Sequence, residues 1–303
     1  FFYYILVEFQ IAIVAIIFWD ILSECFTNRQ AKRLFVIITS GGFLSALIIG
    51  GSLPYTTSYI SQESSVIVSN LMILVCPLFV HKLNKYSFNR SDSLINQKET
   101  TNLINDIFKN KYILNIIYIT FLFTFISVII DYNFKVISYE QFKGDSIGLT
   151  NYFAQFYSIA SFASFIIQIT ISGYIINRFG IKYALLILPV LLLLVFVSGY
   201  FISSFIAILL LKGKEQIFKS TLHDTSMHIL WMPIPSIKRL TLKPIINIIL
   251  KNLFSSFAAG FLIVSVYYGM EFQHFIPIVC FLLLFLIYLS RKTQDYYIKE
   301  LIK

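Results

Sequence analysis

The feature that most constrains the fold is an apolar run from Tyr183 to Leu211, which contains no charged residue. At about 1.5 Å per residue, one helix over this run would be about 44 Å long. That length exceeds a hydrocarbon core of about 30 Å, and it is short for two spans with a turn. Other long apolar runs recur in the chain, of which 57% of residues are hydrophobic and 13% charged. The sequence therefore predicts an all-α polytopic membrane protein.

Loop charge decides how the long run is divided. Basic and non-basic connections alternate along the chain only if the segment SGYFISS, residues 198–204, forms a turn between two spans. We therefore predict nine spans. They are 1–24, 34–52, 65–82, 112–131, 150–176, 183–199, 201–222, 243–267 and 274–290.

The same alternation predicts the orientation. The connections at 53–64, 132–149 and 268–273 hold few basic residues, whereas the C-terminal tail is rich in them. The positive-inside rule then places the C-terminus in the cytoplasm and Phe1 on the far side. The net charge of +9 follows from these loops, so we expect no nucleic-acid partner.

If the N-terminus of the full protein is also cytoplasmic, an odd number of spans is expected before Phe1, and three would give twelve spans in all. Residues 1–82 would then be the last three spans of an N-terminal six-helix bundle. The polar stretch 83–111 would be a cytoplasmic central linker. Residues 112–303 would form a C-terminal six-helix bundle with a short tail.

The stretch LHDTSMHILWMPIP raises the question of a metal or acid–base centre, because His223, Asp224 and His228 fall within six residues. Histidines five apart lie poorly on one helix face, and no third strong ligand is near. The three cysteines are scattered, and no nucleotide-binding loop or hydrolase motif occurs. We expect neither an enzyme nor a cofactor or metal site.

A polar stripe runs along the helix that starts near Phe201. Its members recur at three- or four-residue spacing and share one face, whereas Lys214 points away. They are Lys212, Glu215, Gln216, Lys219 and His223. Lysines near the bilayer middle suit an anionic substrate such as a phosphate. The alternative is a solvated helix end with snorkelling lysines.

The segment GYIINRFGIK, residues 173–182, resembles the loop signature of the major facilitator superfamily. Asn177 stands where the family has an acidic residue. The resemblance implies a helical bundle of the major facilitator type whose N-terminal spans lie before this sequence. It also implies a gating role for four residues of this loop. They are Gly173, Asn177, Arg178 and Gly180.

Several further segments resemble the branch of ATP:ADP antiporter-type nucleotide transporters and their bacterial relatives. They are VEFQIAIVAIIFWDILSECFTNRQAKRLF (7–35), DYNFK (131–135), YSIASFASFIIQITISGYIINRFG (157–180) and FKSTLHDTSMHILWMPIP (218–235). Through these matches the resemblance implies that Glu8, Asp131, Lys135 and Lys219 contact substrate. Asp224 matches the aspartate of the last motif, where we expect the cytoplasmic end of a transport helix and a gating role.

Lys251 is a further candidate for the substrate cavity, because it lies within an apolar span. For each of these residues a structural reading stays open. Lys251 can snorkel to the cytoplasm, Glu8 can be a hydrogen-bonded buried carboxyl, and Asp131 with Lys135 can be a surface ion pair.

The function expected is therefore a membrane carrier that moves a small organic anion by alternating access, in antiport. The resemblance implies a nucleotide such as ATP or ADP, or another phosphorylated metabolite, and the bacterial inner membrane rather than a plastid envelope. The alternative is a degenerate facilitator fold that serves as a membrane scaffold or sensor for fused soluble domains.

Overall fold

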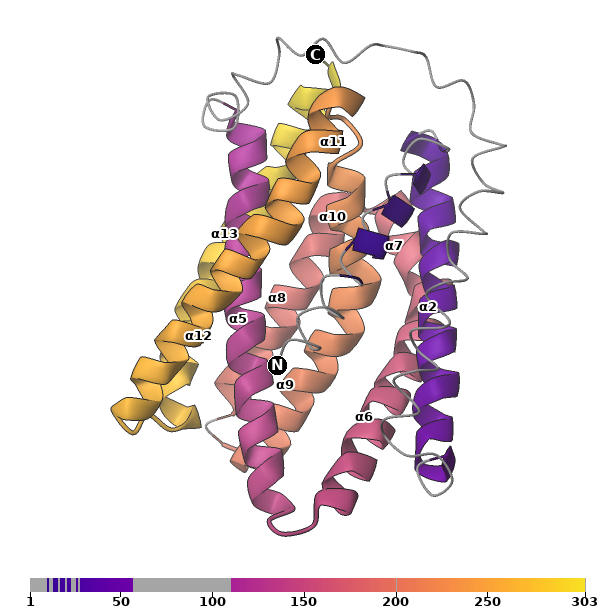
Figure 1. Cartoon of the computed structure of the whole chain (residues 1–303). Coiled ribbons are helices and arrows are strands. Elements are labelled where there is room, and N and C mark those ends of the chain that lie inside the picture. The colour runs from indigo at the N-terminus through magenta and orange to yellow at the C-terminus, as the bar shows by residue number, and fades with distance from the viewer. Residues whose placement is uncertain are drawn as a thin grey trace.

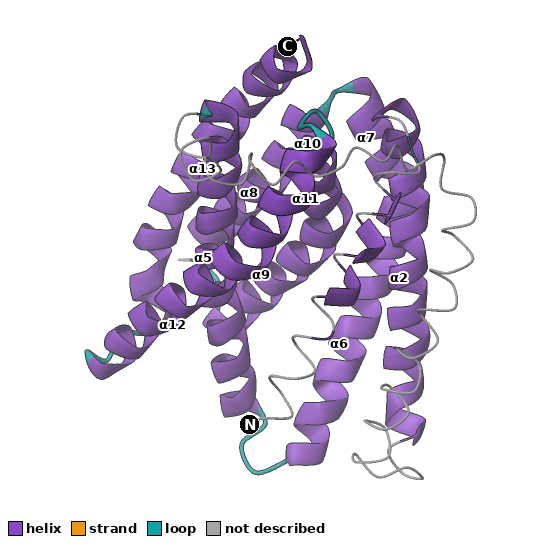
Figure 2. Cartoon of the chain, turned by 45° about the horizontal axis from the view of Figure 1, so that its top comes forward, coloured by secondary structure: helices purple, strands orange, loops and turns teal. Residues whose placement is uncertain are grey.

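The computed structural model describes residues 28–56, 110–199 and 201–302, together with scattered positions between 10 and 26. Every regular element among these residues is helical, and short connections join the elements after residue 110 (Figures 1 and 2). The predicted span 65–82, most of the predicted span 1–24, and all but the end of the predicted linker 83–111 lie outside the described residues.

In the described part of the chain, three single helices and three composite helical rods form the bundle. The simple rods are α5 (Lys111–Gln141), α8 (Ile181–Ser198) and α13 (Phe272–Ile302). Each composite rod contains a π-helical segment. They are α6–η2–α7 (Ser146–Ile167, Gln168–Ser172, Gly173–Arg178), α9–η3–α10 (Ser204–Phe218, Lys219–His223, Asp224–Leu230) and α11–η4–α12 (Ser236–Pro244, Ile245–Leu250, Lys251–Tyr267). A further helix, α2 (Asn28–Thr56), packs along α6 and α7.

Six of the described helical stretches are long and apolar enough to cross a membrane. They are 34–52, 111–141, 147–178, 181–198, 241–267 and 272–300. These stretches indicate an integral membrane protein and correspond to six of the nine predicted spans. The rod α9–η3–α10 is long enough to cross a membrane but is not one of these six stretches. It carries four charged residues between 212 and 219, which make it too polar.

The division of the long apolar run is confirmed. Helix α8 ends at Ser198 and α9 begins at Ser204, so the chain turns back within the predicted segment. The side chain of Ser203 accepts a hydrogen bond from the backbone N–H of Ile206 and caps α9. The two helices then pack side by side.

Two predicted boundaries were wrong. The loop expected at 132–149 is only a turn, because α5 continues to Gln141 and the next helix begins at Ser146. The basic tail after residue 290 is likewise the end of α13. There the buried Thr293 hydroxyl accepts a hydrogen bond from Asn115 of α5 at 2.9 Å. Asp131 and Lys135 pair within α5, and Thr293 pairs with another helix. Polar residues paired in these ways do not end a helix, so loop charge alone misplaced both ends.

The connections gather at two opposite ends of the bundle (Figure 1). The turns after α5 and α12 lie at the lower end, and the C-terminus and the start of α11 lie at the upper end. One large apolar core packs α5, α8, α9, α12 and α13 together, and a second one joins the upper part of α5 to α2, α8 and α10.

Candidate functional site

A row of side chains on α5 faces a row on α9 and η3. On α5 the row is Phe123, Ser127, Asp131 and Lys135, each four residues from the last, so that all lie on one side of the helix. The facing row contains Lys212, Glu215, Lys219 and His223, which are four of the five members of the predicted stripe. Only packing between these two rods brings the rows together.

Lys212 connects the two rows. Its ammonium group lies 3.0 Å from the Asp131 carboxylate and 2.9 Å from that of Glu215. The Asp131 carboxylate also pairs with Lys135 at 2.6 Å. The side chains of Lys212 and Glu215 are 6% and 1% exposed, whereas that of Lys135 is 63% exposed. The buried part of the row is therefore paired at every charge.

Lys219 makes the next contact along the two rows. It lies toward the end of the bundle that the loop charges predict to be cytoplasmic. Its ammonium group lies 3.1 Å from the Glu215 carboxylate and donates to the Ser127 hydroxyl at 2.9 Å. Ser127 in turn donates to Glu215 at 2.5 Å. The Lys219 ammonium also lies 5.4 Å from the ring centroid of Phe123. We call these six polar residues the charge ladder: Ser127, Asp131, Lys135, Lys212, Glu215 and Lys219.

The ladder lies near the middle of its helices. Ser127 is about 24 Å along α5 from Lys111 and about 21 Å from Gln141, at about 1.5 Å per residue. Charged groups at this depth of a bilayer are costly unless they are paired or hydrated. Three lysines face two carboxylates in the ladder, which leaves one excess positive charge. Lys219, whose side chain is 31% exposed, is the cation at one end.

A π-helical segment begins at Lys219 and ends at His223. Such segments insert an extra residue into a helix and recur at functional sites. The π segment η2 of the neighbouring rod packs against η3, and its Gln168 donates hydrogen bonds to the Val36 carbonyl and the Thr39 hydroxyl of α2. Two irregular segments thus meet beside the ladder.

The two histidines of the segment LHDTSMHILWMPIP face different neighbours. His223 stacks on Phe123, with ring centroids 4.0 Å apart, and extends the row on α5. His228 stacks on Trp19, with ring centroids 3.8 Å apart. Among the described residues no group of histidines, cysteines and carboxylates could hold a metal ion.

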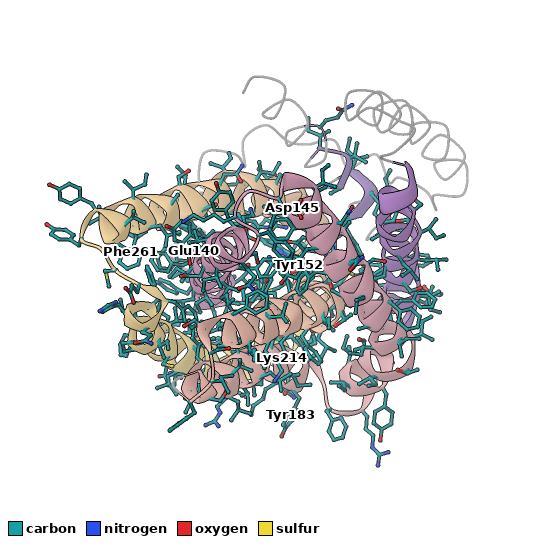
Figure 3. The ribbon with its side chains drawn as sticks, turned by 90° about the horizontal axis from the view of Figure 1, so that it is seen from below. Glu140, Asp145, Tyr152, Tyr183, Lys214 and Phe261 are labelled. Atoms are coloured by element: carbon teal, nitrogen blue, oxygen red, sulfur yellow. The ribbon has the colours of Figure 1, made fainter. Side chains whose placement is uncertain are left out.

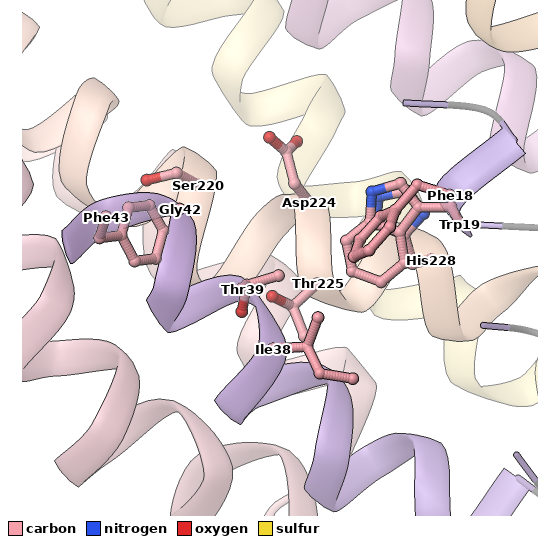
Figure 4. A pocket seen from close by; sticks show the side chains of 10 residues that line it. All are labelled: Phe18, Trp19, Ile38, Thr39, Gly42, Phe43, Ser220, Asp224, Thr225 and His228. Atoms are coloured by element: carbon pink, nitrogen blue, oxygen red, sulfur yellow. The ribbon is translucent and has the colours of Figure 1, made fainter. Parts of the chain in front are cut away.

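A pocket of about 370 Å³ lies between α2 and the η3–α10 part of the α9–η3–α10 rod, which we call the polar rod (Figure 4). Asp224, to which we assigned a gating role by resemblance, lines this pocket at the start of α10. The other lining residues come from the region before α2, from α2 and from the polar rod. They are Phe18, Trp19, Ile38, Thr39, Gly42, Phe43, Ser220, Thr225 and His228.

The loop signature lies at the upper end, between α7 and α8. Gly180 has φ 87° and ψ 173°, a conformation that is essentially confined to glycine. Gly173 packs close to α2, where an added Cβ would lie 3.7 Å from Val36. Asn177 is exposed, and Arg178 is exposed and donates to the Tyr174 hydroxyl on its own helix at 2.7 Å.

The predicted substrate residues divide into three groups. Asp131, Lys135, Lys212 and Lys219 come together in the ladder. Lys251 is exposed at the start of α12 and makes none of the ladder contacts, and Glu8 lies outside the described residues. Lys214 lies across α9 from α5, on the side of Tyr183 (Figure 3).

Sequence reasoning missed Ser127 and Phe123. Their four-residue spacing from Asp131 was the available signal, since it places them on the Asp131 face of α5. It also missed Trp19 and Thr225. Both line the pocket only because α2 and the segment before it pack against the α9–η3–α10 rod.

No family model and no curated protein sequence matches the chain.

Proposed function

We propose that the protein is a membrane carrier of the major facilitator type, which moves an organic anion by alternating access. The cargo class we propose is a nucleotide or another phosphorylated metabolite. The observation that carries this proposal is the charge ladder, with its one excess positive charge near the middle of the α5 and α9 helices.

Lys219 is the group through which the ladder would receive an anion. Its ammonium carries three donors, and its two ladder contacts are Glu215 and Ser127. A phosphoryl oxygen can replace one of these two acceptors while Lys219 keeps its contact with the other. Lysine binds phosphate as a point charge, which tolerates this exchange of partners.

The excess charge supports exchange rather than free cycling. An empty ladder keeps one uncompensated positive charge near the middle of the bilayer while the carrier changes its access, and that is costly. A bound anion compensates this charge. A carrier of this kind reorients more readily when loaded, which is the basis of antiport. The π segments η2, η3 and η4 give the three composite rods places to bend during such a change.

A second function is a membrane scaffold or sensor for soluble domains. The ladder favours it in one respect, because its charges already satisfy one another without a ligand, as in a purely structural ion network.

Counterflow in liposomes tests the two functions. Purified protein would be reconstituted in vesicles loaded with unlabelled ATP, ADP or phosphate, and uptake of the same radiolabelled anion would be measured. The carrier predicts saturable uptake that requires the internal anion. No uptake of any of the three would contradict the proposed cargo class and favour the scaffold.

A further inference from the structure

A row of three aromatic rings follows the connection between α7 and α8. The ring of Phe179 lies between those of Tyr174 and Tyr183, with centroids 5.9 and 6.1 Å away, and both contacts are edge to face. All three side chains are about half exposed. The positive φ of Gly180 turns the chain here, so that a ring of α8 comes beside rings that precede the turn. Contiguous exposed apolar surface marks a place that meets a membrane or another molecule.

Two cations lie at the outer rings of this row. The Arg178 guanidinium lies 5.5 Å from the ring centroid of Tyr174 and donates to its hydroxyl at 2.7 Å. The Lys182 ammonium lies 5.9 Å from the ring centroid of Tyr183. Aromatic rings attract cations, so these contacts hold both charges beside the row. We call the five residues the aromatic–basic patch: Tyr174, Arg178, Phe179, Lys182 and Tyr183.

Neither cation of the patch has an acidic partner. None of the ion pairs found among the described residues involves Arg178 or Lys182. The sequence holds no aspartate or glutamate between Asp145 and Glu215. The patch therefore carries positive charge that the described part of the protein leaves uncompensated, and a partner that complements it is an anion.

The patch lies at the edge of the apolar layer. One candidate membrane-crossing stretch ends at Arg178 and the next begins at Ile181. Lipid headgroups lie at this depth, and tyrosine is enriched there because its ring is apolar and its hydroxyl polar. Figure 3 shows Tyr183 at the periphery of the bundle, with its ring pointing outward. The patch therefore faces the lipid headgroups.

The face of α8 that follows Tyr183 is apolar and exposed. At about 100° per residue, three further exposed side chains lie within about 40° of Tyr183 around the helix. They are Val190, Leu194 and Val197. This face suits acyl chains, which a free phosphate does not have.

We infer that the aromatic–basic patch binds one anionic phospholipid. The lipid phosphate lies between Arg178 and Lys182, and the acyl chains run along the outward face of α8. A zwitterionic lipid brings a cation of its own, which the two basic side chains repel. The loop charges predict that this end of the bundle is cytoplasmic, and the cytoplasmic leaflet is the one that is rich in anionic lipid. This inference does not require that an anion is carried through the ladder.

Native mass spectrometry of the purified protein in detergent tests the inference. Phosphatidylglycerol and phosphatidylcholine with the same acyl chains would be titrated separately, and bound lipid would be counted. We expect a first phosphatidylglycerol to bind at concentrations at which phosphatidylcholine does not. Arg178→Gln and Lys182→Gln should each weaken this binding about fivefold, because each removes one cation near the headgroup.

Lys299→Gln is the matched control. Lys299 is exposed near the end of α13, at the same end of the bundle, and its loss changes the net charge by the same amount. Because Lys299 is not part of the patch, its replacement should leave the affinity for phosphatidylglycerol nearly unchanged. Thermal unfolding of the lipid-free variants reports whether each keeps the fold, and the two patch substitutions give independent tests.

Three results would overturn the inference. They are equal affinity for the two lipids, equal effects of Arg178→Gln and Lys299→Gln, and displacement of phosphatidylglycerol by an equal concentration of glycerol 3-phosphate. The second result would reveal only diffuse attraction by basic residues, and the third would assign the patch to a free phosphate. Because no transport is measured, the outcome is separate from that of the counterflow experiment.

Discussion

The ammonium group of Lys212 lies 2.9 Å from the carboxylate of Glu215, and both side chains are almost fully buried. Glu215 also pairs with Lys219 and accepts a hydrogen bond from Ser127. One carboxylate thus holds two lysines of the polar rod against α5.

Replacing Glu215 with glutamine should therefore destabilise the fold. The change leaves two lysines with less counter-charge, and removal of one partner of a buried ion pair costs about 3–5 kcal/mol. Lys214→Gln, across the same helix, should change the free energy of unfolding by no more than about 0.5 kcal/mol. Denaturant unfolding in detergent measures both. Similar stability of the two variants would show that the ladder is not held by Glu215.

Gly180 should be intolerant of any side chain. Its φ of 87° with ψ of 173° is a conformation that costs other residues about 1–3 kcal/mol. Gly213 is the control, because it lies inside α9, where a Cβ meets nothing within 4 Å. Gly180→Ala should lower the thermal midpoint of unfolding. Gly213→Ala should leave the midpoint unchanged or raise it, because alanine can add up to about 1 kcal/mol to the free energy of unfolding in a helix. The reverse order would contradict the backbone conformation at Gly180.

The two ends of the bundle should differ in access from outside the cell. Lys143 lies exposed in the turn after α5, and Asp295 lies exposed near the end of α13. Single cysteines at these positions, in a background without the three native cysteines, should react oppositely with a membrane-impermeant maleimide on intact cells. We expect labelling at position 143 and protection at position 295. Equal labelling would contradict the orientation.

Arg178 should affect the rate of transport more than the affinity for cargo. It is exposed in the α7–α8 connection, far along the chain from the ladder residues, and its described contact is with Tyr174 of its own helix. Arg178→Ala should change the maximal rate of counterflow with little change in the half-saturating concentration. A large loss of affinity at unchanged protein abundance would place Arg178 in the binding site instead.

Much of the helical layout could be predicted from the sequence because apolar runs and loop charge report it directly. The turn between Ser198 and Ser204 is an example. The end of α5 could not be placed in this way. Asp131 and Lys135 pair one turn apart on α5, so the helix continues through a charged stretch that was expected to be a loop.

The polar stripe on α9 was also predictable, since helical periodicity alone defines it. Its partners were not, because Ser127 and Phe123 matter only through the packing of α5 on α9. The π segments leave no periodicity signal in a single sequence. The Trp19–His228 stack joins residues more than two hundred positions apart, which no local pattern reports.

The central claim is that the ladder binds a phosphorylated anion, and Lys219 tests it most directly. Counterflow of radiolabelled ATP, ADP and phosphate would be measured with Lys219→Gln and Lys214→Gln in parallel. A charge-assisted contact is worth roughly 1.5–3 kcal/mol, so Lys219→Gln should weaken the affinity about ten- to a hundredfold, and Lys214→Gln should do much less. Equal effects of the two substitutions, or no effect of either on any phosphorylated compound, would contradict the claim.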